Sequence, residues 1–264
     1  MTRIEKKFRD LKKQGRKAFI AFIVCGDPNL AATEKIIRQL EANGTDIIEL
    51  GVPFSDPLAD GPVIQAASQR ALKNKVSLKK VIALVKRVRA FSSIPIALFT
   101  YYNPVFKFGE ANLVRQAKSA GVDGLVIPDL PVEEARPLLS LTRKAGLNLI
   151  FFLSPTSPPA RIKLVSRLSS GFIYYVSLTG VTGARKRLSA DLPEKMRLIK
   201  RLCLNKPVCA GFGVSNAGQV AEISKVCDGV IVGSGIVNII QKNIGKKDIA
   251  GKVGSFVRGL TRAL

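Results

Sequence analysis

The sequence contains no histidine and no tryptophan, and only four of its 264 residues are cysteines. Zinc sites are built from histidine and closely spaced cysteines, but Cys25, Cys203, Cys209 and Cys227 form no CxxC pair. We therefore expect no metal site, and we interpret the cysteines as reduced core thiols of a cytoplasmic protein. The aromatic content of 6% leaves few side chains on which nucleic-acid bases would stack.

Acidic residues are also scarce. The sequence has 19 Asp and Glu against 42 Lys and Arg, which gives a formal net charge of +23. Such a field attracts polyanions, so nucleic-acid binding has to be considered. The basic residues are spread over many segments of helical periodicity rather than gathered in one arm. A solvated basic surface is the preferred interpretation, and the charge is also compatible with a small anionic substrate.

No apolar run is long enough to cross a bilayer. The longest, Ala18–Cys25 and Gly229–Ile240, fall short of the ~18–20 residues required. Basic residues precede the first run, as in a signal peptide, but Asp10 interrupts them and residues 25–28 form a turn rather than a cleavage site. We expect a basic N-terminal helix, then a buried strand, and no association with a membrane.

Eight apolar segments recur along the chain, each followed by a turn rich in Gly, Pro, Asp or Ser and then by a segment of helical periodicity. This alternation is typical of parallel strands buried on both faces, and eight such units close into a (β/α)₈ barrel, with an open doubly wound sheet as the competing architecture. We expect one barrel domain over residues 1–264. The predicted strands are Phe19–Val24, Ile47–Leu50, Ile96–Thr100, Gly124–Ile127, Leu149–Leu153, Phe172–Val176, Val208–Ala210 and Gly229–Val232. The predicted helices include Thr33–Asn43, Leu78–Phe91, Ala111–Ala120, Glu133–Ala145, Pro159–Leu168, Pro193–Leu202 and Ala217–Lys225.

In both architectures ligands bind at the carboxyl ends of the strands, and two carboxylates lie there. Glu49 ends an apolar strand, so it either points into a polar cavity or forms an ion pair at a solvated rim. Burial raises the pKa of a carboxyl group, which suits acid–base chemistry near neutral pH. Asp60 follows in a loop with three prolines that is able to hold a second carboxylate over the first. Asp56, immediately before Pro57, is expected to form a turn.

Glycine-rich segments 211–215 and 233–235 follow the last two predicted strands. Barrels often bind phosphate there through backbone N–H groups and a helix N-terminus, which favours an anion by about 0.3–1 kcal/mol. Either segment alone is also explained by a tight turn, but the two together favour phosphate binding. Residues 180–183 add further donors or form a mobile lid.

Aromatic residues lie at several predicted strand ends. Tyr101 and Tyr102 follow the third strand, and Phe22 and Tyr175 lie on the first and sixth. These side chains either pack in the core or form a pocket wall suited to a flat ring.

The longest of these segments resemble the tryptophan synthase alpha chain family. The stretch from Ile48 to Pro62 is the most specific match, and segments 101–104, 123–131, 180–185, 211–215 and 229–234 follow in the same order. The resemblance extends from about the first predicted strand to the eighth. It implies a (β/α)₈ barrel and a lyase, which cleaves indole-3-glycerol phosphate to indole and glyceraldehyde 3-phosphate by a retro-aldol reaction in tryptophan biosynthesis.

The resemblance also implies roles for individual residues. Glu49 matches the acid–base residue, and Asp60 matches the carboxylate that binds the indole N–H and stabilises the positive indolenine intermediate. Thr182 matches the lid threonine that orients Asp60, and Asp56 is grouped with it in the lid. The substrate phosphate is expected at Gly183, Gly213, Gly233 and Ser234. The indole pocket and channel wall are expected at Phe22, Thr100, Tyr102, Ile127 and Tyr175.

The family partner is a beta chain that carries pyridoxal phosphate and joins indole to serine. The resemblance implies an α₂β₂ heterotetramer and no cofactor in this chain. Two alternatives are a catalytically weak subunit that mainly activates a beta chain, and a basic barrel that binds phosphate or nucleic acid. Glu49 and Asp60 favour the enzyme over the first, and the lack of a concentrated basic arm counts against the second. The strong positive charge departs from what is expected of the family.

Overall fold

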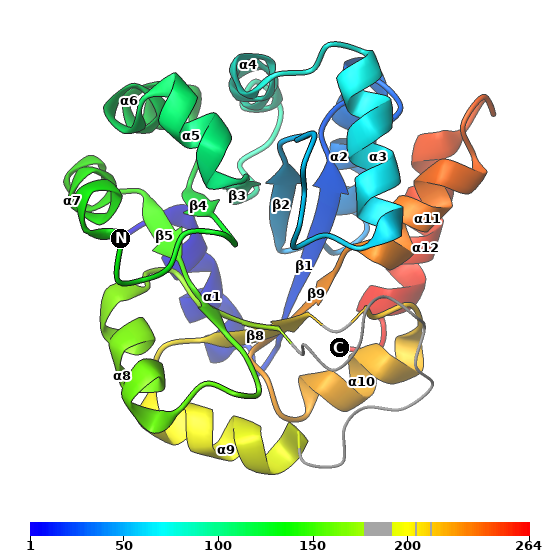
Figure 1. Cartoon of the computed structure of the whole chain (residues 1–264). Coiled ribbons are helices and arrows are strands. Elements are labelled where there is room, and N and C mark those ends of the chain that lie inside the picture. Colours follow the sequence, from blue (N-terminus) through cyan, green and yellow to red (C-terminus); the bar gives the residue numbers. More distant parts are fainter. Residues whose placement is uncertain (177–191, 204, 212) are drawn as a thin grey trace.

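The computed structural model describes residues 1–176, 192–203, 205–211 and 213–264. Its strands form a parallel sheet surrounded by helices (Figure 1). The strands are β1 (Ala18–Val24), β2 (Ile47–Gly51), β3 (Ile96–Phe99), β4 (Gly124–Val126), β5 (Asn148–Ile150), β6 (Phe152–Leu153), β7 (Ile173–Val176), β8 (Val208–Gly211) and β9 (Gly229–Val232). The helices are α1 (Arg3–Lys13), α2 (Leu30–Ala42), α3 (Pro62–Lys73), α4 (Leu78–Val88), α5 (Tyr102–Phe108), α6 (Glu110–Ala120), α7 (Arg136–Ala145), α8 (Pro159–Leu168), α9 (Leu192–Leu202), α10 (Ala217–Ser224), α11 (Ser234–Lys242) and α12 (Ile249–Thr261).

The sheet closes into a barrel. Its strands pair in the order β5-β4-β3-β2-β1-β9-β8-β7-β6, and each pair is parallel. The two terminal strands of this order, β5 and β6, are separated in the chain by Phe151 alone. The Phe151 carbonyl accepts a hydrogen bond of 3.0 Å from the amide of Tyr174, so the chain itself bridges the break. The predicted (β/α)₈ barrel is confirmed, and its fifth predicted strand is divided in two at Phe151.

The helix boundaries differ slightly from those predicted, and local hydrogen bonds explain two of the differences. Helix α2 begins at Leu30 because the side chain of Asn29 accepts the amide of Ala32 at 2.8 Å, which caps the helix three residues earlier than predicted. Helix α7 begins at Arg136 because residues 131–134 form a separate turn. Helices α3, α5, α11 and α12 were not among the predicted segments.

Helix α1 closes the amino-terminal end of the barrel. A capping box formed by Thr2 and Glu5 begins the helix, whose apolar face consists of Ile4, Phe8 and Leu11. This face packs against inward-pointing side chains of the strands, and the Phe8 ring lies 5.7 Å from that of Phe172. The strand residues of this inner core are Ala18, Ile20, Ile47, Ala97, Val126, Ile150, Cys209 and Ile231, and Phe172 joins them from just before β7. The amino-terminal end is therefore a packed core rather than an opening.

Three aspartates tie neighbouring strands together at the same end. Each lies just before a strand, and its carboxylate accepts a backbone N–H of the adjacent strand. The pairs are Asp46 with Phe19, Asp123 with Ile96 and Asp228 with Val208, at 2.9, 2.9 and 3.0 Å. Asp123 also binds the guanidinium groups of Arg3 and Arg89, each at 2.9 Å. These bonds fix the strand register at the end of the barrel away from the predicted site.

Candidate active site

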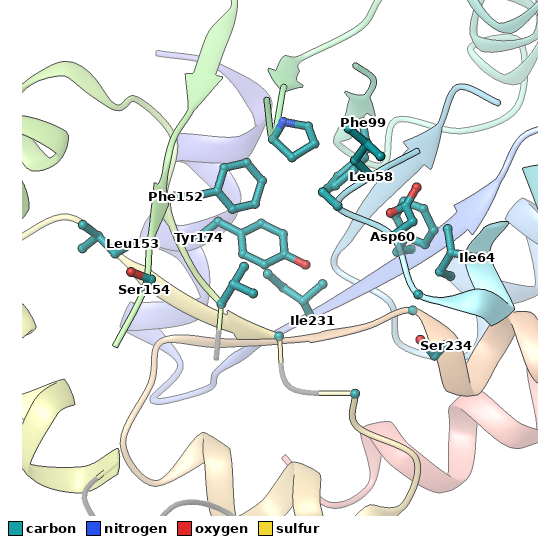
Figure 2. Close-up of a pocket in the computed structure, with 18 of the residues that line it drawn as sticks. Leu58, Asp60, Ile64, Phe99, Phe152, Leu153, Ser154, Tyr174, Ile231 and Ser234 are labelled. Atoms are coloured by element: carbon teal, nitrogen blue, oxygen red, sulfur yellow. The ribbon is translucent and has the colours of Figure 1, made fainter. Parts of the chain in front are cut away.

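A cavity of about 560 Å³ opens at the carboxyl ends of the strands (Figure 2). This volume lies within the usual range for small-ligand sites, about 300–1,000 Å³. The cavity is lined by residues 58–61 of the loop after β2, by aromatic side chains of the strands, and by glycine turns after β8 and β9. The cavity therefore brings together five of the site residues predicted from the sequence: Phe22, Asp60, Gly213, Gly233 and Ser234.

Glu49 lies on β2 and is completely buried inside the barrel. Its neighbours in the sheet register are Phe22 on β1 and Ala97 on β3. Neither carboxylate oxygen has a hydrogen-bond partner among the residues that the structure describes. Burial raises the pKa of Glu49 from 4.5 to about 8. The side chain does not line the cavity itself, but Phe22 beside it does.

Asp60 lines the cavity from the loop after β2. Burial raises its pKa from 3.8 to about 6, and a hydrogen bond from the Tyr101 hydroxyl partly opposes this rise. The same hydroxyl accepts a 3.0 Å hydrogen bond from the amide of Ala59, so Tyr101 holds both the loop and the carboxylate. At neutral pH Asp60 is ionised while Glu49 is protonated, and two carboxyl groups in different states can divide acid–base and electrostatic roles.

Asp56 lies in the same loop but is exposed and does not line the cavity. It accepts a hydrogen bond from the Ser55 hydroxyl at 2.5 Å.

Four aromatic side chains form an arc around the cavity: Phe22, Phe99, Phe152 and Tyr174. The centroids of successive rings lie 5.2, 6.3 and 4.8 Å apart, and the first two contacts are edge-to-face. Figure 2 shows Phe152 and Tyr174 on one side of the cavity and Asp60 and Ser234 on the other. The arc offers an apolar wall to a flat aromatic ring, with a carboxylate opposite.

Among the residues expected around the indole, only Phe22 lines this cavity. Ile127 and Tyr175 are buried in the outer core, among residues that pack under the helices. Successive side chains of a strand point to opposite faces, so the inward positions belong to their neighbours Val126 and Tyr174.

Thr100 and Tyr102 also lie away from the cavity. Thr100 is buried, and its hydroxyl donates to the carbonyl of Tyr101 at 3.3 Å. Tyr102 begins α5, and its hydroxyl donates to Glu110 at 3.1 Å. The neighbouring Tyr101, which was not among the residues expected around the indole, hydrogen-bonds to Asp60.

The glycine turns line the other side of the cavity. Gly213 has a positive φ of 64°, which favours glycine, and a Cβ there would have no neighbour within 4 Å. Gly233 precedes α11 and Ser234 begins it, so the free N–H groups of this helix start at the cavity wall. The expected phosphate-binding residue Gly183 and the lid residue Thr182 lie outside the described residues.

Cysteine and metal chemistry are not evident in the described part of the chain. Cys25, Cys203, Cys209 and Cys227 are buried free thiols, and burial raises the pKa of Cys203 to about 11 and that of Cys227 to about 12. No group of three or more Cys, Asp and Glu side chains there is placed to hold a metal ion.

Comparison with known proteins agrees with the resemblance found in the sequence. The profile of the family described as tryptophan synthase alpha chain matches residues 8–262. A tryptophan synthase alpha chain from Geobacter sp. (strain M21) is 45% identical over 264 residues, which cover 100% of this chain and 98% of the relative. One from Thermoanaerobacter sp. (strain X514) is 45% identical, with 100% of both chains covered.

Solved structures give the same result. The tryptophan synthase alpha chain from Legionella pneumophila subsp. pneumophila superposes with a TM-score of 0.92 at 34% identity and covers 100% of this chain and 97% of its own. A chain of the tryptophan synthase complex from Pyrococcus furiosus gives 0.85 at 36% identity, with 92% and 97% covered. Because these matches span the whole barrel and not only its motifs, the chain belongs to the tryptophan synthase alpha chain family, the lyase subunits that cleave indole-3-glycerol phosphate in tryptophan biosynthesis.

Proposed function

We propose that indole-3-glycerol phosphate binds in the cavity at the carboxyl ends of the strands, and that Glu49 and Asp60 carry out its cleavage. The observation that carries this proposal is the buried carboxyl group of Glu49, which has no hydrogen-bond partner among the described residues and lies beside a cavity that Asp60 lines. An unpaired buried carboxyl group destabilises a fold, so its presence at the site favours a chemical role.

In the proposed reaction, protonated Glu49 gives its proton to C3 of the indole ring. The ring becomes a positively charged indolenine, which the ionised Asp60 stabilises by accepting the indole N–H. The Glu49 carboxylate then takes the proton of the hydroxyl group on the side-chain carbon that is bonded to C3 of the indole. The bond between C3 and this side-chain carbon breaks, its electron pair returns to the ring, and indole and an aldehyde result. Glu49 ends the cycle protonated, as it began, which a pKa of about 8 permits near neutral pH.

The two ends of the substrate match the two sides of the cavity. We place the indole ring within the arc of Phe22, Phe99, Phe152 and Tyr174 and the phosphate at Gly213, Gly233 and Ser234, with Gly183 as a further expected donor. The N–H groups that begin α11 supply donors and a positive dipole end to the phosphate.

We further propose that a beta chain carrying pyridoxal phosphate docks over the same end of a single-domain barrel, forming an α₂β₂ assembly in the cytoplasm. Two large apolar side chains support this: Leu58 and Phe106 are 94% and 71% exposed. Both belong to segments that follow the carboxyl ends of strands, β2 for Leu58 and β3 for Phe106. Exposed apolar groups of this size are typical of protein–protein contacts. Among the described helices, none is long and apolar enough to span a bilayer.

The proposal is tested by measuring indole release from indole-3-glycerol phosphate, with and without a beta chain. The wild-type chain should release indole, Asp60→Asn should release much less, and the beta chain should raise the rate. Phe106→Asp should weaken the affinity for the beta chain in calorimetric titrations. Wild-type chain that releases no indole under either condition would favour a non-catalytic role, which the family matches do not support.

A further inference from the structure

Helix α3 begins immediately after Asp60 and is bonded to it. Gly61 is the N-cap of α3, Pro62 is its first residue, and the side-chain amide of Gln65 donates to the Asp60 carbonyl at 2.9 Å. A shift of this helix therefore moves Asp60 with it.

The buried face of α3 consists mostly of small side chains. The helix lies against β1 and α11 (Figure 1). Its buried residues are Ile64, Ala67, Ser68 and Ala71, of which three are small. Small side chains interdigitate only shallowly with a neighbouring surface, so they offer little resistance to sliding.

An ion pair between Arg70 and a buried carboxylate fixes the other end of α3. The Arg70 guanidinium donates from Nε to Oδ1 of Asp27 at 2.7 Å and from Nη2 to Oδ2 at 2.8 Å. Asp27 is 1% exposed and lies in the turn between β1 and α2. A two-bond fork of this kind fixes orientation as well as distance.

The chain after α3 is locked to the same turn. The Asn74 side chain donates to the carbonyls of Gly26 and Pro28. Gly26 has a φ of 87°, and a Cβ there would lie 2.4 Å from a methyl group of Val76, so the two segments fit closely only with glycine. The turn continues from β1, which also carries Phe22 of the cavity wall.

From these contacts we infer that the Asp27–Arg70 pair is a positioning element that sets the Asp60 carboxylate against the cavity wall. The inference rests on the proposed role of Asp60. The ion pair connects α3, and with it Asp60, to the strand that carries Phe22. Misplacement of a reacting group by about 1 Å can cost on the order of 100-fold in rate, so loosening α3 should lower kcat.

The first test is a double-mutant cycle in which indole release is measured for Arg70→Gln in the wild-type and Asp60→Asn backgrounds. We expect kcat to fall about tenfold or more in the wild-type background and to change less than twofold where Asp60 is already absent. The matched control is Lys73→Gln, because Lys73 is exposed in the last turn of the same helix. This variant should leave kcat unchanged in both backgrounds.

The acid limb of the pH–rate profile provides a readout that a purely structural role would not move. Among the described residues, the titratable groups that interact with Asp60 are Tyr101 after β3 and Tyr174 on β7, and Glu49 on β2 interacts with the same Tyr174. A loosened loop admits water to Asp60 and lowers its pKa, so the limb should move to lower pH in Arg70→Gln while kcat falls. Arg70→Lys, which keeps the charge but not the fork, should give an intermediate kcat, and Asn74→Ala should act in the same direction.

The outcomes separate this inference from the function beneath it. Full activity in Asp60→Asn would overturn the proposed role of Asp60. If Asp60→Asn is impaired but Arg70→Gln lowers kcat equally in both backgrounds, with an unmoved acid limb, then the pair acts only on stability and the inference is wrong. If Arg70→Gln does not fold, kcat is measured for Arg70→Lys and Asn74→Ala in the same two backgrounds.

Discussion

Asp123 and Glu49 are buried carboxyl groups at opposite ends of the barrel, and they differ in whether they have partners. At the amino-terminal end Asp123 is 4% exposed, and it accepts a backbone amide and pairs with two guanidinium groups. At the carboxyl end Glu49 is equally buried, yet it has no partner among the described residues. The satisfied carboxylate of Asp123 stabilises one end, and the unsatisfied carboxyl group of Glu49 lies where the reaction is proposed. The contrast separates residues that hold the barrel from those that act on a substrate.

Glu49→Gln should give the largest effect on activity. The amide keeps the shape of the side chain but transfers no proton, so kcat for indole release should fall by about 10²–10⁴-fold. A loss smaller than about tenfold would remove Glu49 from the acid–base role.

The same variant should change how stability depends on pH. Between the unfolded pKa of 4.5 and the folded value of about 8, the folded state holds a proton that the unfolded state has released. The Glu49 contribution to the free energy of unfolding therefore falls as pH rises through this window. Denaturant titrations should show a smaller decline for Glu49→Gln, and an identical decline would mean that Glu49 is not buried as described.

Asp123→Ala should do the reverse, with a large loss of stability and little change in chemistry. The substitution removes the carboxylate that Arg3, Arg89 and the amide of Ile96 share, and breaking the largely buried pair with Arg89 costs about 3–5 kcal/mol. Urea unfolding measures the loss. The control is Asp10→Ala, which removes a surface ion pair with Arg9 and should change stability by less than about 1 kcal/mol. If folded Asp123→Ala also loses kcat, the two ends are not independent.

Ser234→Asp should affect binding more than either stability or the chemical step. The new carboxylate lies at the start of α11, where the phosphate is proposed, and like charges repel. Binding of a glycerol phosphate analogue should weaken about tenfold or more in calorimetric titrations, while binding of uncharged indole should be unaffected. Equal weakening of both would show that the substitution disturbs the cavity itself.

Tyr101→Phe should produce the smallest change, a shift in pH dependence. The Tyr101 hydroxyl lowers the pKa of Asp60, so its removal raises that pKa and moves the acid limb of kcat upward from about pH 6 by about one unit or less. Tyr102→Phe is the discriminating partner. A shift in this variant and none in Tyr101→Phe would contradict the hydrogen bond between Tyr101 and Asp60.

The alternation of apolar strands and helical segments was enough to predict the barrel, because continuous burial on both faces requires parallel strands covered by helices. The site was harder to predict in detail. A strand that is apolar on both faces does not reveal which side points inward, so Tyr174 could not be told from Tyr175. For the same reason the sequence did not identify Phe99 and Phe152 as residues of the cavity wall. No local pattern indicated that the fifth predicted strand would be divided at Phe151.

Long-range polar contacts were also invisible to sequence patterns. Asp27 and Arg70 are 43 positions apart, and each alone is an ordinary turn or helix residue. Glu49 and Asp60 were found because they lie close together in a specific segment at the carboxyl end of one strand.

The helix that closes the barrel also constrains the order of events during synthesis. Thr2 hydrogen-bonds to Asn148, 146 positions further along the chain, and Arg3 pairs with Asp123. Residues 3–13 are therefore translated long before the groups that receive them exist. Until the later strands have left the ribosome, the apolar face of Ile4, Phe8 and Leu11 lacks part of the native surface that covers it. The basic residues on the opposite side of α1 keep this segment hydrated. Their positive charges repel those of other nascent chains, which opposes association.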